Sequence, residues 1–145
     1  MKRQAYLNLK KRHEQEFSDF PIAYAFNDKQ LTEALEKLGA EKSECVTVFG
    51  HGDIVKQKDV PALFTMLKRH TKELLDALQE DEEFAEAAFL YEMDNHEYAL
   101  NWDGDADVLA ALSLDEKNIY DMGLDGAYRR ARQAHMKHAQ EWDMI

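Results

Sequence analysis

The sequence of 145 residues is short of cysteine and of long apolar runs, and each shortage excludes a class of protein. Its one cysteine, Cys45, excludes an intrachain disulfide framework and favours a reducing compartment. We expect that thiol to be buried and inert, because it lies in a β-rich stretch with no histidine or cation beside it. The basic residues 1–12 are not followed by the apolar segment of a secretory signal. No later run approaches the ~18 apolar residues that cross a bilayer. We therefore expect a cytoplasmic protein without membrane contact.

Repeats, low-complexity tracts and linkers are also absent from the sequence. The length falls within the usual size of one domain, and a chain of this size buries a core without disulfide or metal support. Residues 1–145 are therefore predicted to form a single domain.

Basic residues are missing from one third of the chain. From Glu73 to Glu116 there is no Lys or Arg, whereas 15 of the 29 acidic residues fall there; the other segments carry 14 acids against 18 bases. A field of this sign opposes direct binding to nucleic acid and favours a partner with a basic surface. The predicted partner-binding residues are Glu80, Glu82, Glu83, Glu86, Asp103, Asp105 and Asp107.

Residues 84–100 combine the densest apolar run with the densest group of reactive polar side chains, so we expect the core to form around them. Asp81 is predicted to cap a helix that runs to about Asn95, with Glu82 and Glu83 in its first turn.

Apolar spacing predicts the other elements. Helices are expected over residues 6–20, from Asn27 to Gly39, over 59–78, from Asp105 or Asp107 to Leu112, over 113–122 and over 124–142. Capping boxes are expected at Asn27 with Gln30 and at Ser113 with Glu116. Strands are expected near residues 22–26, 45–49, 54–56 and 98–102, the second and third forming a hairpin. The predicted fold class is α+β, with helices predominating over a small, mainly antiparallel sheet.

The order of these motifs resembles a family of small bacterial and phage proteins, a domain of unknown function. The resemblance rests on RHEQEF at residues 12–17, FPIAYAF at 20–26, MLKRH at 66–70 and, most specifically, FLYEMDNHEY at 89–98. At residues 49–53 this chain has FGHGD where such proteins are more glycine-rich, so His51 and Asp53 are departures. The resemblance implies a self-standing small protein, often carried on mobile elements, and brings no established activity.

The weak catalytic candidates are His96, Glu92, His51 and Asp53, a set that could form a His and carboxylate site. His96 and Glu92 would share a helix face, but the paired histidines of a zincin helix are missing. An equally simple role for Asn95 and His96 is to satisfy carbonyls at a helix end. We therefore predict no bound metal and no cofactor.

Three other motifs are assigned structural roles. Residues 103–107 begin like a calcium loop, but Val108 and Leu114 stand where glycine and a bidentate glutamate are required. His135 and His138 share a helix face yet supply only half of a zinc shell, so we place them between core and solvent. His70 lies on an apolar stripe and is expected to be packed and hydrogen-bonded.

The leading functional hypothesis is a non-enzymatic interaction protein, an inhibitor or decoy encoded by a mobile element. Its acidic third would occupy a basic, nucleic-acid-binding surface of a host protein. Two alternatives stay open. One is a metal-assisted hydrolase or metal-binding protein centred on His96, and the other is an acidic housekeeping domain whose charges only keep it soluble.

Overall fold

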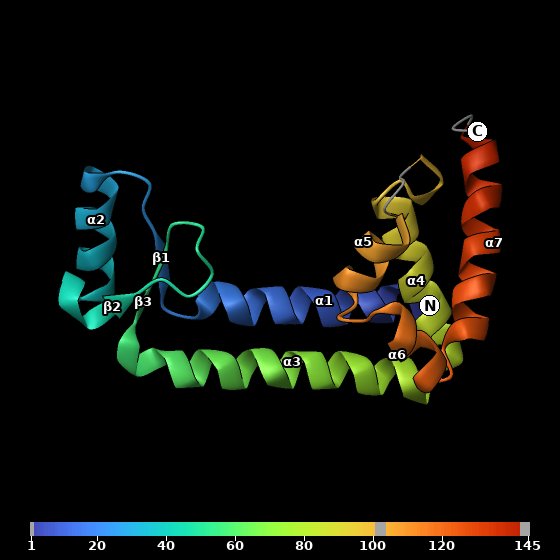
Figure 1. Ribbon diagram of the computed structural model, residues 1–145, viewed down its shortest axis with the longest axis horizontal. Coiled ribbons are helices and arrows are strands. Elements are labelled where there is room, and N and C mark those ends of the chain that lie inside the picture. Colours follow the sequence, from blue (N-terminus) through green and yellow to red (C-terminus); the bar gives the residue numbers. More distant parts are fainter. Residues whose placement is uncertain (1, 101–103, 143–145) are drawn as a thin grey trace. The chain divides into compact units, whose positions relative to one another are not determined.

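The computed structural model describes residues 2–100 and 104–142 and confirms a predominantly helical α+β fold (Figure 1). Within these residues the helices are α1 Lys2–Asp19, α2 Asp28–Leu38, α3 Val60–Glu80, α4 Glu82–Asn95, α5 Gly104–Ala111, α6 Glu116–Asp121 and α7 Asp125–Glu141. The strands are β1 Ile22–Tyr24, β2 Cys45–Val46 and β3 Asp53–Lys56. None of the helices in the described part is both long enough and apolar enough to cross a lipid bilayer.

The chain divides into two compact units. We call residues 1–11 with 71–145 the helical unit, and residues 12–70 the sheet unit. Helices α1 and α3 each contribute residues to both. The single domain expected over residues 1–145 stays a prediction.

The sheet unit is built on three antiparallel strands in the order β1-β3-β2. Tyr24 pairs with Asp53 in one ladder, and Val46 pairs with Val55 in the other. The predicted hairpin is therefore confirmed. Ile22, Val55, Leu63 and Met66 form the buried core between this sheet and α3. Cys45 is only partly exposed, and burial followed by the charge of Glu44 raises the pKa of its thiol.

Strand β2 is shorter than predicted, since it ends at Val46 and leaves Val48 and Phe49 outside the ladder. The reason is a local competitor for their backbone groups. The Asp53 carboxylate accepts hydrogen bonds from the N–H groups of Val48 and Phe49, at 2.7 and 3.0 Å. These donors are then no longer available to a neighbouring strand.

Helix α2 begins and ends as its sequence predicts. Asn27 accepts a hydrogen bond from the backbone of Gln30, and Gly39 ends the helix in the left-handed region at φ 63°. The Gln30 side chain accepts from the N–H of Phe26 rather than from that of Asn27, so the second bond of the predicted capping box lies one residue earlier.

The core of the helical unit forms around α4, as predicted. Asp81 caps this helix by accepting from the N–H groups of Glu83 and Phe84. Its buried side chains, which include Phe84, Phe89 and Met93, pack in one apolar cluster with α5, α6 and α7. Helices α4 and α7 lie side by side (Figure 1).

The prediction of a strand over residues 98–102 is wrong. Tyr98–Leu100 forms a single 3₁₀ turn, so Tyr98 takes no part in the sheet, and Trp102 lies outside the described residues. The backbone N–H of Leu100 bonds locally to Glu97, and that of Ala99 donates to His135. These partners, one local and one distant in sequence, replace the ladder that an alternating pattern suggests.

The prediction that Ser113 caps the N-terminus of α6 is also wrong. Asp115 caps α6 in a reciprocal box with Asn118. Ser113 instead has φ 60°, and its N–H bonds back to Ala110 at the end of α5. Similarly, α5 ends at Ala111 rather than Leu112, and Asp105 and Asp107 lie within its first turn, so neither is its N-cap.

Candidate functional site

Glu92 and His96 lie on one face of α4, as their spacing predicts, with His96 Nε2 3.7 Å from Glu92 Oε1. Glu92 is completely buried, and its carboxylate already has other partners. The Tyr6 hydroxyl donates to Oε2 at 2.8 Å, and Lys10 Nζ lies 3.3 Å from the same oxygen. A buried carboxylate requires such donors. Glu92 thus joins α1 to α4 within the helical unit.

The other two weak candidates, His51 and Asp53, belong to the sheet unit. Asp53 is buried, and its carboxylate also accepts from the backbone N–H of His51 at 3.2 Å. Burial raises the pKa of Asp53, but hydrogen bonds from the backbone of Phe49, Val48 and His51 together outweigh it and hold the pKa below 3.8. Asp53 is therefore an ionised acceptor that organises the β2–β3 turn.

No group of three His, Cys, Asp or Glu side chains arranged to hold a metal ion occurs in residues 2–100 and 104–142. His70, predicted to be packed and hydrogen-bonded, is buried and stacks on His13 with ring centroids 4.0 Å apart. Its Nε2 lies 3.4 Å from Glu16, and this nitrogen has no hydrogen-bond partner among the described residues.

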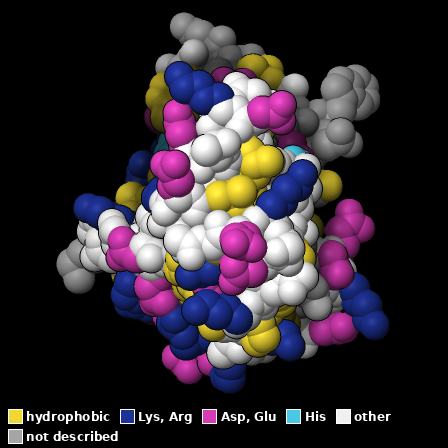
Figure 2. All heavy atoms as spheres, turned by 90° about the vertical axis from the view of Figure 1, so that its left-hand side faces the viewer, with side chains coloured by type: hydrophobic (Ala, Val, Ile, Leu, Met, Phe, Trp, Pro, Cys, Tyr) yellow, Lys and Arg dark blue, Asp and Glu magenta, His cyan; other side chains and the backbone are white. Residues whose placement is uncertain are grey.

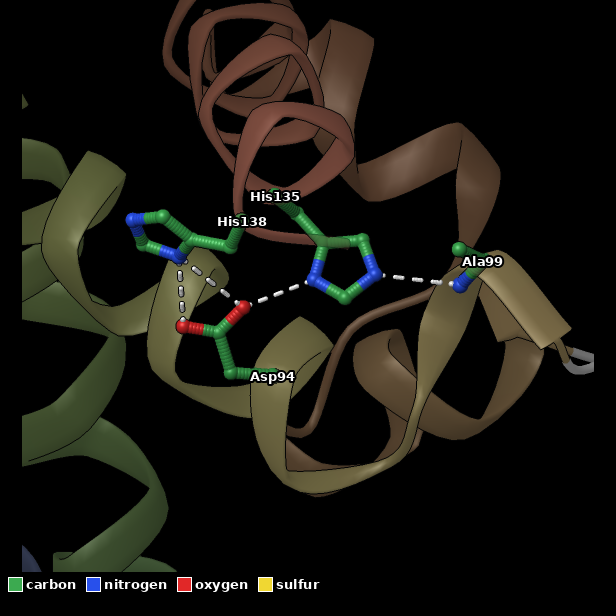
Figure 3. A network of polar contacts seen from close by, with 4 residues as sticks. All are labelled: Asp94, Ala99, His135 and His138. Carbon is green, nitrogen blue, oxygen red and sulfur yellow. Dashed lines mark hydrogen bonds and ion pairs between the residues drawn. The ribbon is translucent and has the colours of Figure 1, made fainter. Parts of the chain in front are cut away.

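A second polar network joins α4 to α7 (Figure 3). The Asp94 carboxylate lies between two imidazoles, with His135 Nδ1 at 2.7 Å from Oδ1 and His138 Nδ1 at 3.1 Å from Oδ2. His135 is completely buried, whereas the side chains of Asp94 and His138 are 16% and 33% exposed. A buried imidazole is thus linked through a carboxylate to one that solvent reaches.

The backbone fixes the tautomer of His135. The N–H of Ala99 donates to Nε2 at 3.0 Å, so Nε2 is an acceptor and the ring proton resides on Nδ1. Nδ1–H then donates to Asp94. Both ring nitrogens are occupied, which leaves His135 with an orienting role toward the carboxylate.

His138 differs because only its Nδ1 faces Asp94, and Figure 3 shows its other nitrogen directed away from the network. Its ring also lies 5.2 Å from that of Trp142. A carboxylate that orients an imidazole while leaving one nitrogen accessible is suited to proton transfer or to protonation-dependent pairing. His138 is therefore the accessible end of this network.

Sequence reasoning placed His135 and His138 on one helix face but did not pair them with Asp94. A signal was present, because a histidine on the apolar face of the last helix needs a buried hydrogen-bond partner. Asp94 near the end of the central helix was a suitable acceptor. Nothing in the spacing, however, indicates which acidic residue of α4 meets which residue of α7.

The predicted partner-binding acids have different environments. Glu80 and Glu83 are exposed. Glu82 and Glu86 face Arg130 of α7, at 3.8 and 2.8 Å. The hydroxyls of Tyr98 and Tyr128 both donate to Asp105. Asp107 is partly buried, and Asp103 lies outside the described residues.

Three further acids of this third have lysine partners. Lys2 donates to Asp81 and thereby lowers the pKa of that carboxyl, Lys10 contacts Glu92, and Lys72 pairs with Asp76 at 2.6 Å. The acidic third of the sequence therefore does not form a uniformly acidic surface, because several of its carboxylates are paired with basic side chains. The exposed carboxylates that remain around the α3–α4 junction are those of Glu80, Glu82 and Glu83.

Comparison with known proteins places the chain in a family. Residues 5–134 match the model of a family of unknown function (DUF7659). Neither the curated proteins nor the solved structures include a match to this chain. The match covers Glu92 and its contacts with Tyr6, Lys10 and His96, and it includes Asp94, but it ends just before His135 and His138. The chain is therefore a member of this family of unknown function.

Proposed function

We propose that the protein is a non-enzymatic interaction protein that engages a basic surface of a partner protein. The observation that carries the proposal is the exposure of Glu80, Glu82 and Glu83 at the junction of α3 and α4. We call these three residues the acidic corner. A net charge of −11 adds a long-range field that attracts a basic partner and repels nucleic acid.

The acidic corner offers carboxylates that a partner's arginine or lysine side chains can pair with. Glu82 contacts Arg130 at 3.8 Å and keeps 71% of its side chain exposed, so an incoming arginine can compete for it. Such contacts give fast, salt-sensitive association, because exposed charges are screened within a Debye length. The partner class we propose is a nucleic-acid-binding protein whose phosphate-contacting groove the carboxylates occupy.

The resemblance to small bacterial and phage proteins supports a role as an inhibitor or decoy carried on a mobile element and acting in the host cytoplasm. In that role the protein would displace DNA or RNA from its partner. The alternative of a solubilising acidic surface predicts no such displacement.

The test combines capture with displacement. The purified protein is used to capture partners from host lysate at low and high salt, and the captured protein is then assayed for release of labelled DNA or RNA. Reversal of Glu80, Glu82 and Glu83 to lysine should abolish both capture and displacement. The matched control reverses three exposed acids elsewhere, Glu14, Glu33 and Glu36.

Figure 2 looks onto the side that carries α2 and shows acidic and basic side chains interspersed there. The control set is suitable because it reverses the same number of exposed acids outside the acidic corner. An equal loss of capture and displacement in both charge-reversed variants would show that only net charge matters and would refute specific binding through the acidic corner. Binding that survives reversal of the acidic corner would end the proposal.

A second candidate, metal-assisted hydrolysis centred on His96, is favoured by one observation, the pairing of His96 with Glu92 at 3.7 Å. Lys10 and Tyr6 already contact that carboxylate, so a metal would have to displace them. Elemental analysis of untagged protein and unfolding with and without chelator test it, because a metal that binds only the native state raises the apparent stability. His96→Ala that folds normally but loses metal or activity would support this candidate; metal-free protein insensitive to chelator would refute a tight site.

A further inference from the structure

A cleft of about 440 Å³ opens in the helical unit between α5, α6 and α7. Charges of both signs line it: Asp105 from α5, Glu116 from α6, and Asp125, Arg129 and Arg132 from α7. Asp125, Arg129 and Arg132 are four and three residues apart, so they share one face of α7. None of these residues belongs to the acidic corner, so the cleft is independent of the proposed function.

One of these charges, Asp105, is already held in place by hydrogen bonds. Asp105 accepts hydrogen bonds from the hydroxyls of Tyr98, at 2.7 Å, and Tyr128. Burial and the bond to Asp105 raise the pKa of Tyr98, and Arg132 acts in the opposite direction. Burial, followed by the bond to Asp105, raises the pKa of Tyr128, so its hydroxyl stays a donor. This wall of the cleft is preorganised.

Glu116, Asp125 and Arg129 have no such partner among residues 2–100 and 104–142. In the described part of the chain, no ion pair holds Glu116, Asp125 or Arg129. All three nevertheless line the same cleft. Uncompensated charges of opposite sign that converge on one concave site are the polar groups expected of a small-molecule pocket.

Apolar side chains supply the rest of the lining. Leu109 and Ile119 are buried, and Tyr120 lies at the cleft with 73% of its surface exposed. An exposed tyrosine ring beside buried aliphatic groups can cover an apolar part of a ligand. The volume falls within the range of about 300–1,000 Å³ that small-molecule sites occupy.

We propose that this cleft binds a small zwitterion, an amino acid with an apolar side chain. Its carboxylate is held by Arg129 with Arg132, its ammonium faces Glu116 and Asp125, and its side chain lies against Leu109, Ile119 and Tyr120. A lone anion would leave Glu116 and Asp125 without a partner and a lone cation would leave Arg129 without one, so a ligand with both charges complements the lining best.

The test is titration of the full chain, followed by nuclear magnetic resonance, with L-leucine, L-methionine and L-phenylalanine. At least one should give saturable shifts confined to α5, α6 and α7. The N-acetyl and carboxamide derivatives of that amino acid each lose one charge, so both should bind at least about tenfold more weakly. The corresponding dipeptide carries its ammonium and carboxylate on different residues, so it should bind more weakly than the free amino acid; equal or tighter binding of the dipeptide would overturn the proposal of an amino-acid site.

Variants locate the site independently. Arg129→Gln and Glu116→Gln should each weaken binding about tenfold or more. Lys137→Gln is the matched control, because Lys137 is an exposed cation of α7 outside the cleft. The proposal is overturned if none of the three amino acids binds at millimolar concentration, if either charge-blocked derivative binds as well as the parent, or if Lys137→Gln weakens binding as much as Arg129→Gln.

Discussion

Replacement of Asp94 by alanine tests the network between α4 and α7 most directly. The carboxylate is the only acceptor seen for Nδ1–H of His135 within the described residues, and His135 is completely buried. Loss of the acceptor leaves a buried donor unpaired, which costs about 1–3 kcal/mol. The contact with the partly exposed His138 adds about 0.5 kcal/mol. We expect Asp94→Ala to lower the free energy of unfolding by about 2–3 kcal/mol.

Three companion variants separate the contributions. Asp94→Asn keeps an oxygen that can accept from His135 and should cost about 1 kcal/mol. His138→Ala removes the partly exposed contact with Asp94 and the ring contact with Trp142, and should cost less than about 1 kcal/mol. Asn95→Ala changes the exposed neighbour of Asp94 and should remain within about 0.5 kcal/mol of the parent. The expected order of destabilisation is therefore Asp94→Ala first, with the other three well below it.

Urea unfolding followed by far-ultraviolet circular dichroism gives these free energies, and Asp94→Ala should also lower Tm by about 5–10 °C. Nitrogen-15 nuclear magnetic resonance of the imidazole rings gives a second readout, because it reports which ring nitrogen carries the proton. In the parent protein the ring proton of His135 should reside on Nδ1. A stability for Asp94→Ala no lower than that for Asn95→Ala would refute the energetic reasoning. A proton on Nε2 of His135 would refute the assigned tautomer.

Three other predictions concern the backbone and Asp53. Gly50 and Gly52 both have φ near 80°, but a Cβ at Gly52 would lie 2.9 Å from the backbone oxygen of Ala25 and 2.7 Å from the ring of Phe26, while one at Gly50 meets nothing within 4 Å. Thermal melts should show a loss of about 1 kcal/mol for Gly50→Ala and at least ~1 kcal/mol more for Gly52→Ala, and equal losses would contradict the steric argument. Ser113→Gly should raise stability by about 0.5–1 kcal/mol, since φ 60° suits glycine, and a decrease would argue that Ser113 caps α6 after all. Asp53→Asn should lower the free energy of unfolding by about 2–3 kcal/mol at neutral pH. The pKa of Asp53 is lowered in the folded state, so the stabilisation by its carboxylate is complete above pH 3.8 and is lost as the pH falls through the folded-state pKa. The difference in stability between the two proteins should therefore shrink in acid. A difference independent of pH would show that the ionised form is not what the turn requires.

Local features of the fold could be predicted from sequence because their causes are local. Asn27 and Gly39 bound α2, and Asp81 caps α4, through contacts within a few residues. The hairpin likewise follows from a short glycine-containing turn between two β-rich segments. The alternation at Tyr98 and Leu100 wrongly predicted a strand for the opposite reason. The N–H of Ala99 donates to His135, an acceptor 36 residues away in sequence.

The candidate sites show the same contrast between local features, which sequence spacing predicts, and contacts between distant residues, which it does not. The shared face of Glu92 and His96 follows from helix periodicity and is confirmed. The partners that occupy Glu92, Tyr6 and Lys10, lie more than 80 residues away in sequence, and spacing cannot reveal them. Charge behaves similarly: Arg130 lies 44 residues from Glu86, so the neutralisation of part of the acidic third depends on how α7 packs against α4.

The division of the chain into a sheet unit of contiguous residues and a helical unit of two separate segments bears on how the protein is made. Residues 12–70 leave the ribosome together and can begin to fold as soon as they emerge. The helical unit has to wait, because Tyr6 must find Glu92, a residue synthesised 86 positions later. Until α4 emerges, the apolar groups of residues 1–11 lack their partners. Nascent chains stopped before Glu92 should therefore protect the sheet unit from protease while the first helical turns stay accessible.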